Sequence, residues 1–247
     1  MKNIVTIAAA LFLGAGVSAQ AQIAFSGMNI SVDALVPVNP SADILGYSLN
    51  GQATFTSGAL GFQVDFGAGV APSGGVWAAE AYDAGLHVFK TVSDRVKLGG
   101  FVAYDDTSEG FGIKILTYGA EAMLDFENLD AEFSIANTES PDTPFEVVQS
   151  SANAYYQISA PLTANIGWTR YFFDSSPLNV YEIGLDYQFA NLPISIGVSY
   201  LVSYTNGVAD GDGAIAASVS YSFGPQSDDR AFSKRGFNFL NLNLMAL

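Results

Sequence analysis

Residues 213–223 read GAIAASVSYSF. Apolar side chains occupy every second position, ending in Val219, Tyr221 and Phe223, and small or hydroxyl-bearing side chains lie between them. Successive side chains of a β-strand point to opposite faces of the sheet. This stretch therefore predicts a strand with one apolar face and one small polar face, and similar alternation recurs along most of the chain.

The two faces of such strands need different surroundings. In residues 181–189, Tyr, Ile, Leu, Tyr and Phe share one face, while Glu182, Gly184, Asp186 and Gln188 share the other. A carboxylate in a dry core is costly unless it is paired, and the chain has 24 acidic but only 9 basic residues. The polar face is therefore predicted to meet water. The apolar face then packs in a soluble core or, if the sheet closes around water, faces lipid.

Composition favours the lipid-facing arrangement. Charged residues make up 13% of the chain, about half the usual share for a soluble domain. The formal net charge of −15 argues against a nucleic-acid partner, because phosphate binding requires cationic side chains. The chain has no cysteine, so no disulfide holds it together. Backbone hydrogen bonds of a transmembrane sheet would have to do so.

The first 21 residues carry the features of an export signal. Lys2 gives a basic start, residues 4–17 form an almost continuous apolar run, and Ala19-Gln20-Ala21 is a small-residue cleavage site. We expect a signal peptide over 1–21, cleavage near Ala21 and secretion of the remaining chain. A retained N-terminal anchor is the alternative, but the apolar run is short for a membrane span.

Twelve strands are expected between Gln22 and Phe223. Their predicted ranges are 24–35, 44–56, 59–70, 76–90, 95–105, 112–126, 129–137, 147–159, 163–173, 179–189, 193–204 and 213–223. Tight turns follow the even-numbered strands, and longer polar loops follow the odd-numbered ones, at 37–43, 71–75, 106–110, 138–146, 174–179 and 206–212. This alternation is the plan of outer-membrane barrels. The predicted fold is all-β, a transmembrane antiparallel up-and-down β-barrel of about 12 strands with a water-facing acidic lumen.

The chain resembles bacterial outer-membrane β-barrel proteins, in particular small porin-like proteins of Gram-negative bacteria. The resemblance lies in the export signal, the alternating strands, the loop asymmetry and the last strand, where Val219, Tyr221 and Phe223 match the terminal assembly signal of that class. It implies a location in the cell outer membrane, contact with outer-membrane lipid and lipopolysaccharide, and insertion by the barrel assembly machinery. It also implies transport of small solutes or ions. It is compatible with a homo-oligomer but does not decide the oligomeric state.

The chain continues beyond Phe223, although the class usually ends at this aromatic residue. The tail, residues 224–247, carries Arg230, Lys234 and Arg235. It could form a periplasmic appendage, a thirteenth strand or a segment folded back into the lumen. An even number of strands favours the periplasmic appendage, which is the prediction.

Signatures of catalysis and of metal binding are weak. His87 is the only histidine, and no motif of an activated nucleophile surrounds it. One histidine without cysteine leaves only oxygen ligands for a metal. We therefore expect no enzymatic activity, no catalytic residue, no cofactor and no metal site, with His87 as an ordinary lumen residue.

The expected function is a porin-like passive diffusion channel for small hydrophilic solutes, with a preference for cations because strand phase places many carboxylates inside. The alternative is a structural or adhesion-type barrel with a blocked lumen, since Phe101 and Tyr155 also point inward in this phase. The residues predicted to line the lumen are Asp33, Asp65, Asp83, His87, Lys97, Glu121, Asp125, Asp130, Glu132, Glu182 and Asp186.

Overall fold

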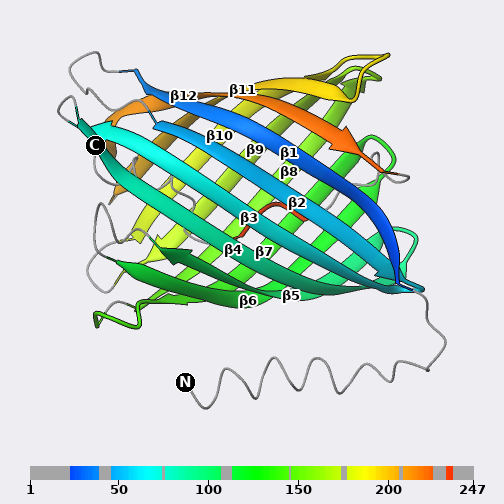
Figure 1. The fold of residues 1–247 in the computed structure, drawn as a ribbon, viewed down its shortest axis with the longest axis horizontal. Coiled ribbons are helices and arrows are strands. Elements are labelled where there is room, and N and C mark those ends of the chain that lie inside the picture. Colours follow the sequence, from blue (N-terminus) through cyan, green and yellow to red (C-terminus); the bar gives the residue numbers. More distant parts are fainter. Residues whose placement is uncertain are drawn as a thin grey trace.

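The computed structural model describes residues 23–38, 46–73, 76–106, 113–144, 146–173, 177–205, 208–224 and 232–235. Twelve β-strands form within these residues (Figure 1). They are β1 (Ala24–Pro37), β2 (Gly46–Ser57), β3 (Leu60–Ser73), β4 (Val76–Ser93), β5 (Val96–Asp106), β6 (Lys114–Phe126), β7 (Leu129–Glu139), β8 (Glu146–Ser159), β9 (Leu162–Phe172), β10 (Pro177–Gln188), β11 (Ile194–Thr205) and β12 (Val208–Phe223). Within the described ranges, no helix is long and apolar enough to cross a membrane.

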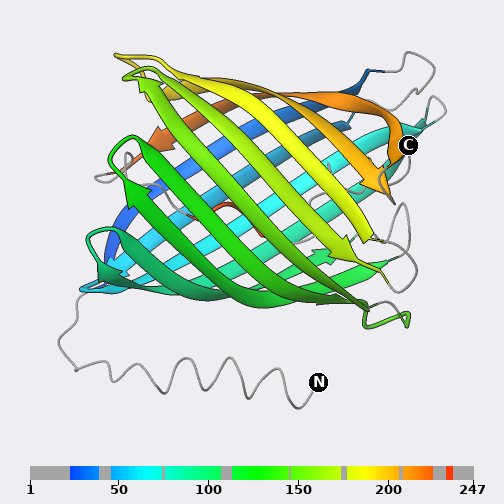
Figure 2. The ribbon, with the colours of Figure 1, turned by 180° about the vertical axis from the view of Figure 1, so that it is seen from behind.

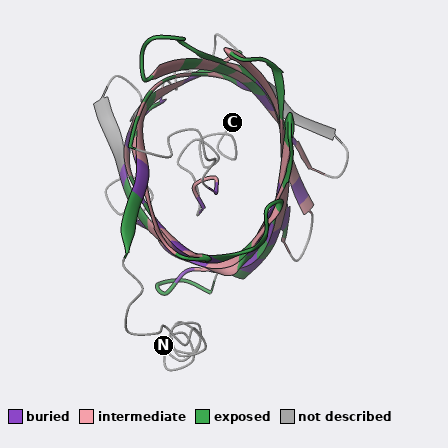
Figure 3. Ribbon diagram, turned by 90° about the vertical axis from the view of Figure 1, so that its right-hand side faces the viewer, coloured by how far each residue is buried: buried purple, intermediate pink, exposed green. Residues whose placement is uncertain are grey.

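The strands close into a barrel. Each strand pairs antiparallel with the next one along the chain, and β1 pairs with β12 from Met28↔Phe223 to Pro37↔Ala214. The strands run obliquely across the wall in both side views (Figures 1 and 2), and the view along the axis shows a ring (Figure 3). Since each described strand has a neighbour on both sides, the sheet presents no unpaired edge. The predicted up-and-down barrel is confirmed.

The two ends of the barrel differ. We call the end at which β1 begins and β12 ends the short-turn end, and the opposite one the long-loop end. At the short-turn end, Gly58 (φ 62°) lies between β2 and β3, and Glu127 (φ 55°) lies between β6 and β7. Left-handed backbone at such positions lets two strands connect through two residues.

Apolar side chains face outward. In β10, Tyr181, Ile183 and Leu185 are exposed, whereas Gly184 between them is buried on the inner face. The same alternation leaves many large apolar side chains exposed on the wall, among them Val32, Leu49, Val64, Phe66, Phe133, Ile135, Ile166, Val198, Tyr200 and Val219. Exposed aromatic residues lie near the long-loop end (Tyr47, Tyr82, Tyr104, Phe172) and near the short-turn end (Phe126, Phe189, Tyr221, Phe223). The outer wall thus has the apolar band and aromatic borders typical of a lipid-facing barrel.

The predicted strand ranges agree with the structure to within three residues, except that β12 begins at Val208 rather than at 213. Two predicted long loops are wrong. β3 and β4 pair as far as Ser73↔Val76, and β11 and β12 pair as far as Thr205↔Val208. Each of these hairpins contains a register shift, which absorbs the residues that would otherwise break the pairing.

Some predictions fall outside the described residues. The predicted signal peptide over 1–21 and its cleavage near Ala21 are among them, as are residues 225–231 and 236–247 of the tail. Within the tail, the structure describes Gly224 and Phe232–Arg235.

Candidate functional site in the barrel lumen

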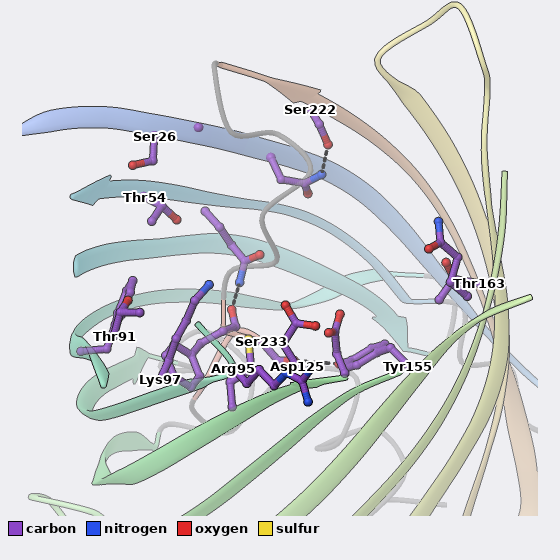
Figure 4. A pocket seen from close by; sticks show the side chains of 18 of the residues that line it. Ser26, Thr54, Thr91, Arg95, Lys97, Asp125, Tyr155, Thr163, Ser222 and Ser233 are labelled. Carbon is purple, nitrogen blue, oxygen red and sulfur yellow. Dashed lines mark hydrogen bonds between the residues drawn. The ribbon is translucent and has the colours of Figure 1, made fainter. Parts of the chain in front are cut away.

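Polar side chains line two cavities inside the barrel. The larger, of about 810 Å³, reaches the short-turn end, where its lining includes Arg95, Asn128 and Gln188 (Figure 4). The smaller, of about 340 Å³, lies under the strands from β7 to β12, with Trp168 and Tyr171 in its lining. Six of the predicted lumen residues border these cavities: Lys97, Asp125 and Asp130 the larger, Asp33 and Glu182 the smaller, and Asp186 both.

A piece of the tail lies inside the barrel. Residues Phe232–Arg235, here called the lumen segment, lie within the ring of strands when the barrel is viewed along its axis (Figure 3). The Phe232 and Arg235 residues are 1% and 8% exposed. Ser233 borders both cavities, so the segment lies between them. The sequence predicts a periplasmic tail, whereas these four residues lie in the lumen.

Phe232 fits an aromatic niche on β4. Its ring lies 6.2 Å from the His87 ring in a stacked arrangement and 5.3 Å from the Phe89 ring, edge to face. Its backbone carbonyl accepts hydrogen bonds from the amide of Gln63 at 2.8 Å and from that of Gln52 at 3.1 Å. Apolar packing and backbone recognition therefore act together at this residue.

Ser233 binds Glu132 of β7. Its backbone N–H lies 3.0 Å from Glu132 Oε1, and its hydroxyl donates to Glu132 Oε2 at 2.7 Å. The Tyr155 hydroxyl lies 2.8 Å from the same serine oxygen. Because Glu132 is 1% exposed, this carboxylate is satisfied by the segment rather than by water.

The two cations of the lumen segment contact separate carboxylates. Lys234 Nζ donates to Asp83 Oδ2 at 2.6 Å and to Asn50 Oδ1 at 2.6 Å. Arg235 Nε donates to Glu121 Oε2 at 3.0 Å, and its Nη2 donates to Glu132. Burial lowers the pKa of the Arg235 guanidinium, but Glu132 and Glu121 more than offset this, so the net pKa lies above its ordinary value.

His87 contacts two carboxylates, one with each ring nitrogen. Its Nε2 lies 2.7 Å from Asp65 Oδ2, and its Nδ1 lies 2.8 Å from Glu121 Oε1. Ionised carboxylates only accept hydrogen bonds, so both ring nitrogens donate and the imidazole carries a positive charge. The Phe101 ring stacks on His87 at 5.7 Å, and the Arg235 guanidinium lies 5.5 Å from the same Phe101 ring.

We call Asp65, Asp83, Glu121 and Glu132 the acidic cradle. All four are among the predicted lumen residues. Asp83, Glu121 and Glu132 contact the lumen segment directly, and Asp65 contacts the predicted His87, on which Phe232 stacks. What the sequence does not predict is the partner that they hold. The available signal is charge: Lys234 and Arg235 lie in a tail that follows a strongly acidic barrel sequence.

An apolar cluster, here called the apolar collar, lies on the inner wall near the long-loop end. It consists of mutually packed, buried residues on inward-facing positions of seven strands: Leu35, Ile115, Val147, Tyr171, Leu178, Val180, Leu201 and Ala214. The Tyr171 side chain is among the largest fully buried ones. The inner wall near this end is therefore apolar in part, with polar residues such as Thr117 and Gln149 on the same strands as the collar.

The surroundings of His87 bear on catalysis and on metal binding. The single histidine is fully buried and occupied by two carboxylates. Among the residues that the structure describes, no cluster of histidine and carboxylate side chains is arranged to hold a metal ion. The arrangement is suited to binding positive charge.

Comparison with known proteins bears on the fold. Neither protein-family models nor curated protein sequences match this chain. Among solved structures, a KdgM porin in complex with disordered oligogalacturonate has a TM-score of 0.60 and 10% identity, covering 80% of this chain and 99% of that one. A NanC porin has a TM-score of 0.56 and 10% identity, covering 79% and 98%. An outer membrane channel from Pseudomonas putida F1 has a TM-score of 0.58 and 8% identity, covering 83% and 98%.

At such low identity the likeness concerns the fold and not the cargo. The three proteins are nearly fully covered by this chain, so the correspondence extends over the whole barrel. The chain has the closed antiparallel barrel fold of bacterial outer-membrane porins and channels.

Proposed function

We propose that this protein is an outer-membrane channel for small hydrophilic solutes with a preference for cations. One observation carries the proposal: a closed twelve-strand barrel has exposed apolar side chains on its outer wall and a polar cavity of about 810 Å³ inside. A sheet with this polarity is stable where lipid surrounds it and water fills it. The export pattern of residues 1–21 supports the same location.

The preference for cations rests on the charges of the wall. Asp125, Asp130 and Asp186 border the larger cavity, with Lys97 and Arg95 as its basic side chains. Asp33 and Glu182 border the smaller one. Carboxylates in a narrow passage with low-dielectric walls focus negative potential and raise the local cation concentration.

A second function is favoured by two other observations. The lumen segment lies between the two cavities, and the apolar collar lies near the long-loop end. A barrel closed in this way would serve envelope structure or adhesion rather than transport. The two functions differ in one measurable property, ion conductance.

Conductance of the full-length protein in planar lipid bilayers is the test. We expect discrete ion-conducting steps, and a reversal potential in a salt gradient that has the sign of cation selectivity. Protein that inserts and folds but carries no current at any applied voltage would favour the structural barrel. An anion-selective channel would contradict the assignment of the wall charges.

A further inference from the structure

We propose that the acidic cradle is a binding site for organic cations bearing guanidinium or ammonium groups, and that the lumen segment is its intramolecular occupant. The inference rests on the proposed channel function, because such cations reach the cradle through the lumen. The site is built by β3, β4, β6 and β7, which supply Asp65, Asp83, Glu121 and Glu132.

Charge balance is the first argument. With the lumen segment in place, His87, Lys234 and Arg235 face the four carboxylates of the cradle. Without the segment, His87 would be the one cation of these three that still contacts the cradle. Buried carboxylates without counter-charges are strongly unfavourable. An emptied cradle therefore favours the binding of other cations.

The geometry defines two subsites with different chemistry. At the first, Glu121 and Glu132 receive the guanidinium of Arg235, and the Phe101 ring lies 5.5 Å from its central carbon. A planar, delocalised cation suits both the carboxylates and the aromatic ring. At the second, Asp83 and Asn50 receive the compact ammonium of Lys234. A ligand carrying both groups would satisfy both subsites.

Unused acceptors indicate that the cradle has spare capacity. Among the described residues, Asp83 Oδ1 and Gln63 Oε1 are buried side-chain oxygens without a hydrogen-bond partner. Both belong to residues that already contact the lumen segment through their other polar atom. A buried acceptor without a donor is costly, so a ligand with more N–H groups than the segment would gain here.

The lumen segment separates the cradle from the two cavities. Phe232 and Ser233 border the larger cavity, and Ser233, Lys234 and Arg235 border the smaller one. A segment tethered to the end of β12 competes at an effective concentration on the order of millimolar. Free cations should therefore bind the cradle poorly until the segment is weakened.

The test uses the full-length chain with Lys234→Gln and Arg235→Gln, which removes both cations of the segment. The probe is L-argininamide, which carries one guanidinium and one ammonium group. At about one hundred times its Kd, we expect it to raise the thermal midpoint of the double variant by roughly 5–10 °C and that of the unmodified protein much less. In bilayers it should block current through the double variant more strongly than through the unmodified protein.

Three controls separate the cradle from general charge effects. L-Citrullinamide replaces the guanidinium by an uncharged urea group and should neither stabilise nor block. The variant Lys90→Gln with Lys114→Gln removes two cations outside the cradle and should respond like the unmodified protein. Adding Glu132→Gln to the double variant should weaken the response to L-argininamide.

The outcomes are distinguishable. If L-argininamide fails to stabilise a folded double variant, or if L-citrullinamide stabilises it equally, the cradle is not a cation site. If stabilisation occurs but no variant conducts, the cation site stands and the channel function fails. Should the double variant not fold, Lys234→Gln alone vacates the ammonium subsite, and stabilisation by methylammonium but not by acetamide is then the expected result; equal response to both would overturn the proposal.

Discussion

Leu185 and Asp186 are neighbours in β10 with opposite surroundings. The Leu185 residue is 46% exposed on the outer wall, whereas Asp186 points into the lumen and accepts a hydrogen bond from Asn165 at 2.9 Å. Because side chains alternate along a strand, these two consecutive residues face opposite sides of the wall. Single substitutions therefore report directly which side meets lipid.

Leu185→Arg is expected to destabilise the folded barrel by ~2–4 kcal/mol, because a cation near mid-membrane loses its hydration. Asp186→Asn should cost much less, since asparagine keeps an oxygen that accepts from Asn165. Refolding titrations in lipid vesicles measure both free energies. Equal costs for the two variants would contradict the assignment of inner and outer faces.

Glu132 is the residue on which the lumen segment depends most. It accepts from the backbone and hydroxyl of Ser233 and from the guanidinium of Arg235. Each hydrogen bond to a charged group contributes ~1.5–3 kcal/mol. Removing its charge should release the segment before it affects the barrel wall.

Trypsin provides the readout, because Lys234 and Arg235 are its cleavage sites and are protected while they lie in the lumen. With Glu132→Gln, cleavage at these two bonds should accelerate about tenfold to a hundredfold, since cleavage follows the population of the released segment. Glu139→Gln, at the far end of the same strand, is the matched control and should leave the rate unchanged. Equal cleavage of both variants would argue that Glu132 does not hold the segment.

Among the elements, β12 has two roles. It closes the ring by pairing with β1, and it ends in outward-facing Tyr221 and Phe223, whose rings lie 6.0 Å apart. The Phe223 ring also lies 6.3 Å from the ring of Phe25, which belongs to the neighbouring strand β1. In the outer-membrane barrels that this chain resembles, the corresponding aromatic residue usually ends the chain, whereas here residues 224–247 follow it.

Phe223→Ala therefore tests whether an internal strand end still serves as the assembly signal. We expect less folded barrel in the outer membrane of expressing cells, while refolding of the purified chain into detergent changes little. Ser220→Ala, on the inner face of the same strand, is the control. Unchanged outer-membrane yield for Phe223→Ala would remove Val219, Tyr221 and Phe223 from the assembly role.

How far the sequence predicts these elements depends on the range of the interactions that form them. Strand positions follow from alternation over about ten residues, and eleven strands begin where the pattern places them to within three residues. The pattern does not predict the extension of β12 to Val208, because glycine and aspartate at 210–213 read as a loop, whereas a register shift at 211–213 lets the pairing resume at Ser203↔Asp210. The place of Phe232–Arg235 depends on carboxylates from three distant strands, β4, β6 and β7, and no local pattern encodes such a contact.

For the molecule as a whole, the wall charges act together through the solvent that fills the lumen. If the channel conducts, its cation selectivity should weaken with added salt, because the Debye length falls from ~10 Å at 0.1 M to ~3 Å at 1 M. Replacing Asp125, Asp130 and Asp186 by asparagine should shift the reversal potential toward zero at low salt. Selectivity independent of salt would place its origin in close contacts rather than in the field of the lumen.

The seam between β1 and β12 also sets an order of events. Every other pairing in the sheet joins consecutive strands, whereas the seam brings together distant residues such as Asn29 and Ser222, which are 193 positions apart. Contacts between sequence neighbours form early and distant ones late, so we expect the ring to close last. Only then does an enclosed interior exist for Phe232–Arg235 to occupy. A newly closed barrel thus passes through a stage in which ions from the surrounding solution balance the charge of its carboxylates. The salt composition of the folding medium should therefore change the rate at which the segment enters the lumen.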